Sequence, residues 1–169
     1  GTSPATHVLA LDTKDPNAIW RRVVDMPNTE TKWVTATTCA AKLYLFCEAT
    51  DEAFVLDPLV ATWRKIQPPP TPLSSGAATA IGNRYVLLAG GSAKANDPSQ
   101  TPDGKPRHYI SNDCFLYDAA NDCYLVQTPL KQGVLDQGLL YIGDTIYCLG
   151  GEESSHRSRT DLVQIGKLR

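Results

Sequence analysis

The chain has 169 residues, a hydrophobic content of 42%, a charged content of 20% and a formal net charge of −2. This composition is typical of a folded globular domain and argues against disorder. No basic stripe stands out and apolar runs such as 85–89 are short, so neither nucleic acid nor a membrane span is expected. A charged start followed by an apolar run is missing, so targeting cannot be read and an extracytoplasmic location, periplasmic or secreted, stays open.

Apolar residues and turn signals predict short strands throughout, and no window shows the 3.6-residue apolar period of a helix. In chain order, strands are expected at 5–12, 19–23, 33–40, 42–46, 53–58, 62–66, 76–81, 84–89, 113–118, 123–126, 138–142, 145–149 and 160–165. The run 68–72 has a backbone donor only at Thr71, so it is an extended connector. A long polar loop is expected between residues 92 and 109.

One sequence pattern occurs three times along the chain. Residues 142–152 read as strand end, tight turn, strand and Gly-Gly, and residues 81–92 repeat this order. A third copy at 41–48 has Cys47-Glu48 in place of Gly-Gly. Gly82-Asn83 and Gly143-Asp144 suit two-residue hairpin turns, and Gly-Gly lets the backbone turn where a side chain would clash.

A second feature recurs at a fixed place in each unit. An Asp precedes an aromatic residue at Asp12 and Trp20, at Asp57 and Trp63, and at Asp118 and Tyr124. The Asp carboxylate is expected to cap the turn into the next strand, and the aromatic ring to fill the wedge between neighbouring sheets.

Together these features resemble the kelch repeat, which forms one four-stranded antiparallel blade of a β-propeller. The resemblance implies an all-β fold with about three blades, two complete and two partial. The expected boundaries are 1–27 for the end of a blade, 33–66 and 76–128 for complete blades, and 134–169 for a partial final blade. Because an open half-ring would expose sheet faces, we expect a missing half or a second copy of the chain to complete the ring.

The five cysteines show no metal-like spacing. Cys114 and Cys123 are candidates to face each other across two adjacent strands, whereas the plainer expectation is buried free thiols.

The loop after the last Gly-Gly carries the candidate site. Glu152 and Glu153 are followed by His156, Arg157 and Arg159. A carboxylate beside a guanidinium can accept a proton next to an anion-binding fork, although such residues also form ordinary surface ion pairs.

A narrower resemblance, to the C-terminal half of bacterial kelch proteins of the N-acetylneuraminate epimerase (sialic acid mutarotase) group, rests on two motifs. These are Leu11-Asp12-Thr13-Lys14-Asp15-Pro16 with Trp20, and Gly-Gly-Glu followed by Arg159-Thr160-Asp161. The resemblance implies an isomerase acting on a sugar acid, with Glu152 or Glu153 and Arg159 as catalytic residues. Arg157, His156 and Arg107 are the candidates for substrate binding, while a solvated His156 and an ordinary insertion around Arg107 are the alternatives.

No cofactor is required for this chemistry, and no metal site is expected, since neither ligand clusters nor phosphate-cradling loops are present. The expected partner is a small sugar acid such as sialic acid. The alternative is a non-catalytic module for protein–protein interaction, because kelch propellers often present their loops to protein partners.

Overall fold

The structure, a computed structural model, describes residues 7–27, 34–47, 50–71, 73–94, 108–153 and 158–168. Within these ranges all helices and strands that can be assigned are β-strands, with no α-helix among them. The strands are β1 (His7–Ala10), β2 (Arg21–Asp25), β3 (Val34–Cys39), β4 (Lys42–Cys47), β5 (Glu52–Asp57), β6 (Thr62–Ile66), β7 (Ala77–Ile81), β8 (Tyr85–Ala89), β9 (Ser92–Lys94), β10 (His108–Ile110), β11 (Cys114–Asp118), β12 (Cys123–Val126), β13 (Gly138–Ile142), β14 (Thr145–Leu149) and β15 (Val163–Lys167).

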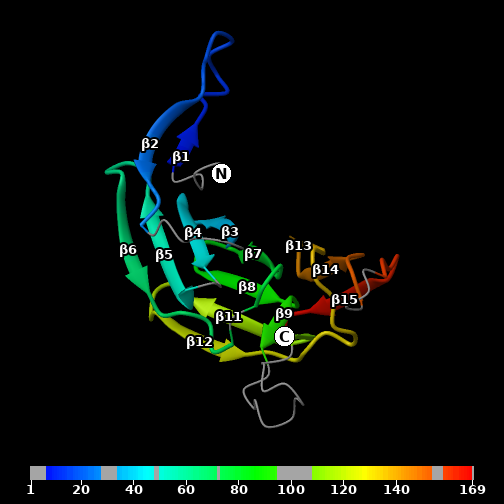
Figure 1. Cartoon of the computed structure of the whole chain (residues 1–169). Helices are drawn as coiled ribbons and strands as arrows, with labels where there is room; N and C mark the ends of the chain where they lie inside the picture. Colours follow the sequence, from blue (N-terminus) through cyan, green and yellow to red (C-terminus); the bar gives the residue numbers. More distant parts are fainter. Residues whose placement is uncertain are drawn as a thin grey trace.

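Four of the five described sheets follow one another along a curved path (Figure 1), and the fifth is the two-stranded sheet β9-β10. The two complete sheets have the orders β3-β4-β5-β6 and β7-β8-β11-β12 and are antiparallel throughout. A two-stranded sheet, β1-β2, precedes them and a three-stranded sheet, β13-β14-β15, follows them. The fold is therefore an all-β segment of a propeller, with two complete blades and two partial ones.

The first strands of consecutive sheets, β3, β7 and β13, lie next to one another. Three apolar layers fill the spaces between sheets, and the first of them, Leu45, Cys47 and Phe54 with Met26 and Trp63, lies between β1-β2 and the first complete sheet. Cys39, Tyr44, Phe46, Val86 and Tyr117 pack between the two complete sheets. Between the second complete sheet and the last sheet, the buried residues are Ile81, Leu87, Ala89, Cys114, Val134, Leu139 and Cys148.

The expected strands are present, with three differences, and the loop expected between residues 92 and 109 is wrong at its two ends, where β9 and β10 form a pair of strands. The turn between β7 and β8 has three residues, because Ile81 pairs with Tyr85, so the expected two-residue turn at Gly82-Asn83 is wrong. The strand expected at 160–165 lies at Val163–Lys167, since Thr160 donates to the Gly151 carbonyl and Leu162 accepts from the Gly150 N–H. The expected strand at 19–23 lies at Arg21–Asp25.

The Gly-Gly pairs have the backbone conformation that the sequence indicates. All four glycines have positive φ, and a Cβ on Gly91 would lie 2.7 Å from the Ser74 carbonyl oxygen. On Gly151 it would lie 2.6 Å from the Leu135 carbonyl oxygen. No side chain fits at such distances, so glycine is required there.

Each Asp–aromatic pair also acts as expected where a neighbouring sheet is present. The carboxylates of Asp12, Asp57 and Asp118 each accept a hydrogen bond from the backbone N–H two residues further on. Trp63 packs edge-on against Phe54 and donates its ring N–H to the Asp25 carbonyl of the preceding sheet at 2.8 Å. Tyr124 likewise donates its hydroxyl to the Gln67 carbonyl, 3.0 Å away. Trp20 has no preceding sheet among the described residues and is 64% exposed.

All five cysteines are free thiols, of which Cys123 is exposed and the other four are buried. Cys123 pairs with Asp118, whereas the Cys114 carbonyl accepts from Gln127 at the opposite end of the β11–β12 hairpin. The two cysteines therefore do not face each other.

Candidate functional site

The chain after each Gly-Gly forms a small second ladder that the sequence did not reveal. After Gly90-Gly91, Ser92 bridges to Ser74 and pairs with Ile110, at the start of the β9–β10 hairpin. After Gly150-Gly151, Glu152 bridges to both Leu135 and Arg159. Glu152 and Arg159 thus occupy the positions of Ser92 and Ile110 in the preceding sheet.

This ladder brings two of the predicted site residues together. Residues directly opposite each other in an antiparallel pair direct their side chains to the same side, with Cβ atoms about 5 Å apart. The half-buried Glu152 and the exposed Arg159 therefore share one side of the ladder. No ion pair joins Glu152 or Glu153 to Arg159 among the described residues.

Glu153 is held in a different way. Its N–H donates to the Ser158 carbonyl, and its carboxylate accepts a hydrogen bond from the Gln132 side chain. Glu153 is exposed and lies one position past the Glu152–Arg159 pair. Between the two predicted glutamates, Glu152 is therefore the one that the backbone pairs with Arg159. His156, Arg157 and Arg107, the other predicted site residues, lie outside the described residues.

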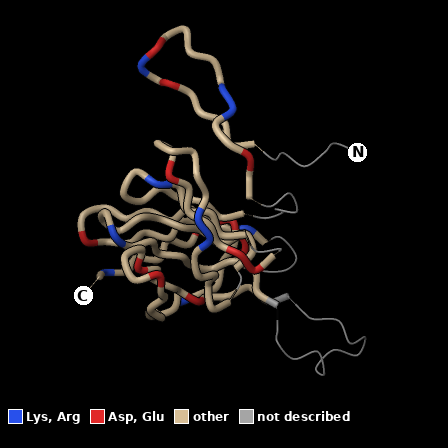
Figure 2. The backbone as a smooth tube through the Cα atoms, turned by 90° about the vertical axis from the view of Figure 1, so that its left-hand side faces the viewer, with Lys and Arg blue, Asp and Glu red and all other residues tan. Residues whose placement is uncertain are grey.

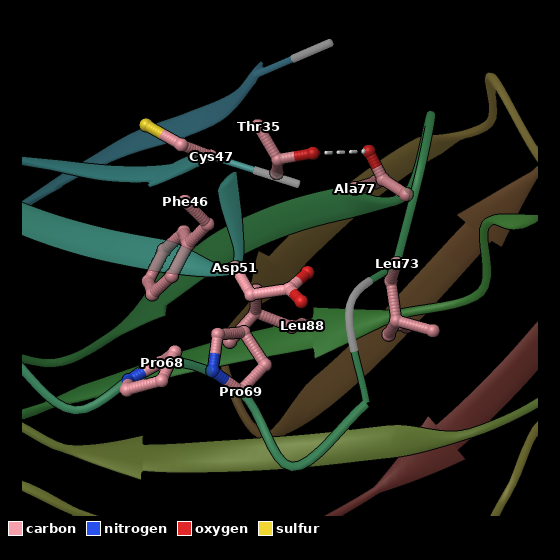
Figure 3. Close-up of a pocket in the computed structure, with 11 residues that line it drawn as sticks. Thr35, Phe46, Cys47, Asp51, Pro68, Pro69, Leu73, Ala77 and Leu88 are labelled. Atoms are coloured by element: carbon pink, nitrogen blue, oxygen red, sulfur yellow. Dashed lines mark hydrogen bonds between the residues drawn. The ribbon is translucent and has the colours of Figure 1, made fainter. Parts of the chain in front are cut away.

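A cleft lies between the two complete sheets, and neither Glu152 nor Arg159 is among its lining residues (Figure 3). The empty volume of the cleft is about 380 Å³, which includes space open to solvent. Its walls are mainly apolar, and the carboxylate of Asp51 and the hydroxyl of Thr35 are its side-chain polar groups; Thr35 donates to the Gly76 carbonyl at 3.0 Å. The lining residues are Thr35, Phe46, Cys47, Asp51, Pro68, Pro69, Leu73, Gly76, Ala77, Leu88 and Ala89.

This cleft was not expected from the sequence, although one signal was present. The first copy of the repeat has Cys47-Glu48 in place of Gly-Gly and a short loop before β5, and Pro68-Pro69 of the connector after β6 lines the cleft. Burial raises the pKa of the Cys47 thiol to about 11. The thiol therefore stays protonated near neutral pH, which makes it an apolar wall rather than a nucleophile.

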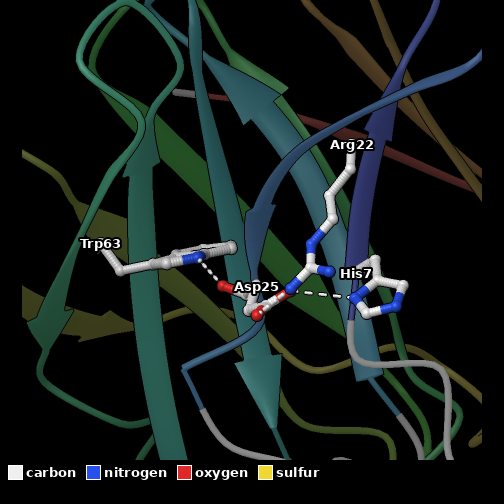
Figure 4. A network of polar contacts seen from close by, with 4 residues as sticks. All are labelled: His7, Arg22, Asp25 and Trp63. Atoms are coloured by element: carbon white, nitrogen blue, oxygen red, sulfur yellow. Dashed lines mark hydrogen bonds and ion pairs between the residues drawn. The ribbon is translucent and has the colours of Figure 1, made fainter.

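A cluster of polar contacts lies around Asp25 in the first partial sheet (Figure 4). Asp25 forms a 2.9 Å contact with Nδ1 of His7 and an ion pair with Arg22, while its carbonyl accepts from Trp63. Hydrogen bonds from His7 and then Arg22 lower the pKa of the Asp25 carboxyl. The His7 and Arg22 contacts lie within the β1–β2 hairpin, whereas the Trp63 hydrogen bond fastens the hairpin to the next sheet, so the cluster has a structural role.

Charges of both signs are interspersed along the described backbone (Figure 2). No three His, Cys, Asp or Glu side chains of the described residues gather in a way that could hold a metal ion. In the same part of the chain, no helix has the length and apolarity needed to cross a membrane.

No protein-family model matches the chain. Two curated relatives match at low identity: human "Kelch repeat and BTB domain-containing protein 12", 25% identical over 109 residues, and "Kelch-like protein 22" of Xenopus tropicalis, 26% identical over 105 residues. These alignments cover 61% and 62% of this chain but 17% and 15% of the relatives.

The solved structure of YjhT superposes with a TM-score of 0.79 at 14% identity, covering 96% of this chain and 55% of YjhT. The chain therefore has a kelch-type propeller fold and spans about half the length of that structure.

Proposed function

We propose that the chain is part of a carbohydrate-active kelch propeller that binds a sugar acid, with sialic acid as the specific candidate and exchange of its anomers as the reaction. The observation that supports this best is the Glu152–Arg159 pair, which the last Gly-Gly ladder places side by side. The resemblance of the Gly-Gly-Glu and Arg-Thr-Asp motifs to sialic acid mutarotases supports the same assignment.

The roles follow from the chemistry of the two groups. The Arg159 guanidinium would bind the substrate carboxylate through two parallel hydrogen bonds. The Glu152 carboxylate would accept the proton of the anomeric hydroxyl as the bond between the ring oxygen and the anomeric carbon breaks. The ring oxygen takes up a proton from water, the C–C bond beside the opened anomeric carbon rotates, and reversal of these steps gives the other anomer.

The test is the rate of anomer exchange of sialic acid, measured by NMR with and without the protein. Glu152→Gln is expected to reduce the acceleration by about 100-fold or more, because it removes the base. Arg159→Ala should mainly weaken substrate binding, and Arg159→Lys should restore part of it. Arg64→Ala, an exposed arginine on β6, is the matched control and should leave the rate unchanged. Absence of any acceleration would refute the mutarotase proposal.

A second candidate function is a non-catalytic module for protein partners. Exposed apolar side chains on the last sheet and the two curated kelch relatives favour it. Normal binding of a protein partner by Glu152→Gln and Arg159→Ala variants, together with no effect of sialic acid, would support this function over the first.

A further inference from the structure

The cleft between the two complete sheets lies where the repeat has a glycine in place of a longer side chain. Gln137 directly precedes β13 and Gly76 directly precedes β7, and both strands start opposite the last residue of the second strand of their sheet, so the two residues hold equivalent positions. The buried Gln137 side chain reaches the preceding sheet, where it donates to the Ala89 carbonyl at 2.6 Å. Gly76 has no side chain to fill this space, and it lines the cleft.

The loop after the second strand differs as well. In the second complete sheet, Gly90-Gly91 leads into β9, which pairs with β10. In the first complete sheet, Cys47 still pairs with Glu52, so residues 48–51 alone connect β4 to β5. A connection of this length cannot hold a strand pair like β9–β10. The cleft therefore opens beside the short connection, and Asp51 belongs to its lining.

The interior of the cleft is apolar. Its buried lining residues carry no charge, since the Cys47 thiol is protonated near neutral pH: they are Phe46, Cys47, Leu73, Leu88 and Ala89. Pro68 and Pro69 are half-buried and add two further apolar rings to the lining. A ligand group that enters between the sheets must therefore be apolar, because a polar group would lose its hydrogen bonds to water there.

The polar side chains of the lining offer hydrogen-bond acceptors. Asp51 is exposed, and Figure 3 shows its carboxylate directed into the cleft. Within the part of the chain that the structure describes, this carboxylate forms no ion pair and accepts no hydrogen bond. The Thr35 hydroxyl donates its proton to the Gly76 carbonyl, which leaves its lone pairs as acceptors. A ligand that meets these groups must bring hydrogen-bond donors and a positive charge.

We propose that this cleft binds a small primary amine whose ammonium group is joined to an apolar group. The apolar group enters between the sheets, against Leu88 and Pro69, and the ammonium stays at the mouth, where it donates to the Asp51 carboxylate. The empty volume of about 380 Å³ is at the lower end of the range for small-molecule pockets, about 300–1,000 Å³. Because neither Glu152 nor Arg159 lines the cleft, this site does not depend on the sugar-acid proposal.

The order of charge and apolar surface in the cleft favours a free amine over a lysine side chain of a protein partner. A lysine carries its ammonium at the tip, so the charge would reach the apolar interior while the apolar stem passed Asp51. A small amine enters in the opposite direction, with its apolar group first, and leaves the charge beside the carboxylate.

Binding is tested by titrating phenethylamine into the full chain and following the amide signals by NMR. We expect saturable shifts at cleft residues such as Gly76 and Leu88, with half-saturation below about 10 mM. Two further ligands separate the contributions: 2-phenylethanol lacks the charge and methylamine lacks the apolar group. Each should bind at least about threefold more weakly than phenethylamine. If phenethylamine causes no saturable shifts at these residues, the proposal is wrong.

Asp51→Asn tests the carboxylate, because asparagine keeps the size of the side chain and tolerates the left-handed backbone of this position, with φ of 51°. The change should weaken phenethylamine binding at least about threefold and leave 2-phenylethanol binding unchanged. Asp136→Asn is the matched control, since Asp136 is also exposed, has φ of 53° and does not line the cleft. Phenethylamine binding that is equal in the unchanged chain and in Asp51→Asn, or weakened equally in both variants, would overturn the proposal.

Discussion

Ala40 and Ala41 form the two-residue turn between β3 and β4, and both have positive φ, 50° and 58°. This turn geometry favours Asn-Gly, and the left-handed conformation costs an ordinary residue about 1–2 kcal/mol. Replacing the pair by Asn-Gly should therefore stabilise the chain by about 1 kcal/mol, measured by urea unfolding. Ala36→Gly, in the adjacent strand, is the control and should destabilise it by about 0.5–1 kcal/mol. A loss of stability in the Asn-Gly variant would contradict the assigned turn.

Asp118 combines a turn-capping role with an ion pair in which the Asp118 carboxylate is buried and the Arg84 side chain is half exposed. Its side chain accepts two hydrogen bonds from Arg84, at 2.9 and 2.6 Å, and others from Ala120 and Asn121. The Arg84 hydrogen bonds are the main reason that the pKa of the Asp118 carboxyl lies well below its usual range. Arg84 belongs to the three-residue β7–β8 turn, so its hydrogen bonds link this turn to the end of β11.

The pH dependence follows from the direction of that shift. Because the folded-state pKa is lower than the unfolded one, the carboxylate contributes its stabilisation fully above about pH 4. That contribution is lost as the pH falls below this value toward the folded-state pKa. Asp118→Asn and Arg84→Met should each flatten the decline of the unfolding free energy between about pH 4 and pH 2. A decline as steep as in the unchanged chain would show that the pair does not control acid stability.

At the scale of the elements, the two kinds of glycine in the repeat have different roles. Gly82 has positive φ but open space around its Cβ position, whereas a Cβ on Gly91 would overlap backbone atoms of Ser74 and Gly76. Gly91→Ala should therefore cost roughly 3 kcal/mol or more, because backbone must move. Gly82→Asn should cost less than about 1 kcal/mol, since Asn tolerates this conformation. Similar costs measured by urea unfolding would contradict a steric role for the second glycine of Gly-Gly.

The strands could be predicted because each strand of the repeat occurs in several copies. The order of strand, turn and strand in 142–152 therefore supports the same assignment in the weaker copy at 41–48. The pairing of the segments that follow each Gly-Gly could not be predicted. The Glu152–Arg159 pairing depends on hydrogen-bond register across a loop of unknown path, and Ser92–Ile110 in the same place shares no residue type with it. The cleft beside Asp51 was missed for a similar reason, since it requires two sheets to be placed against each other.

At the scale of the whole molecule, each sheet contributes one face to the sheet before it and one to the sheet after it. Both complete sheets follow this rule, since apolar layers cover the first on both faces, around Leu45 and Phe46, and the second on both faces, around Phe46 and Leu87. The face of β13-β14-β15 that carries Ile142 and Ile165, the open face, is exposed among the described residues. Stability should therefore be distributed unevenly, with equivalent residues contributing more inside the arc than at its end.

Ile81 and Ile142 measure this difference directly, since they hold the same position in consecutive sheets with 8% and 62% exposure. Ile81→Ala should cost about 2–5 kcal/mol, because it removes buried methylenes and leaves a cavity. Ile142→Ala should cost less than about 1 kcal/mol in the chain alone, as at other exposed sites. Urea unfolding of the two variants gives both values, and a similar loss at both positions would mean that the open face is already covered.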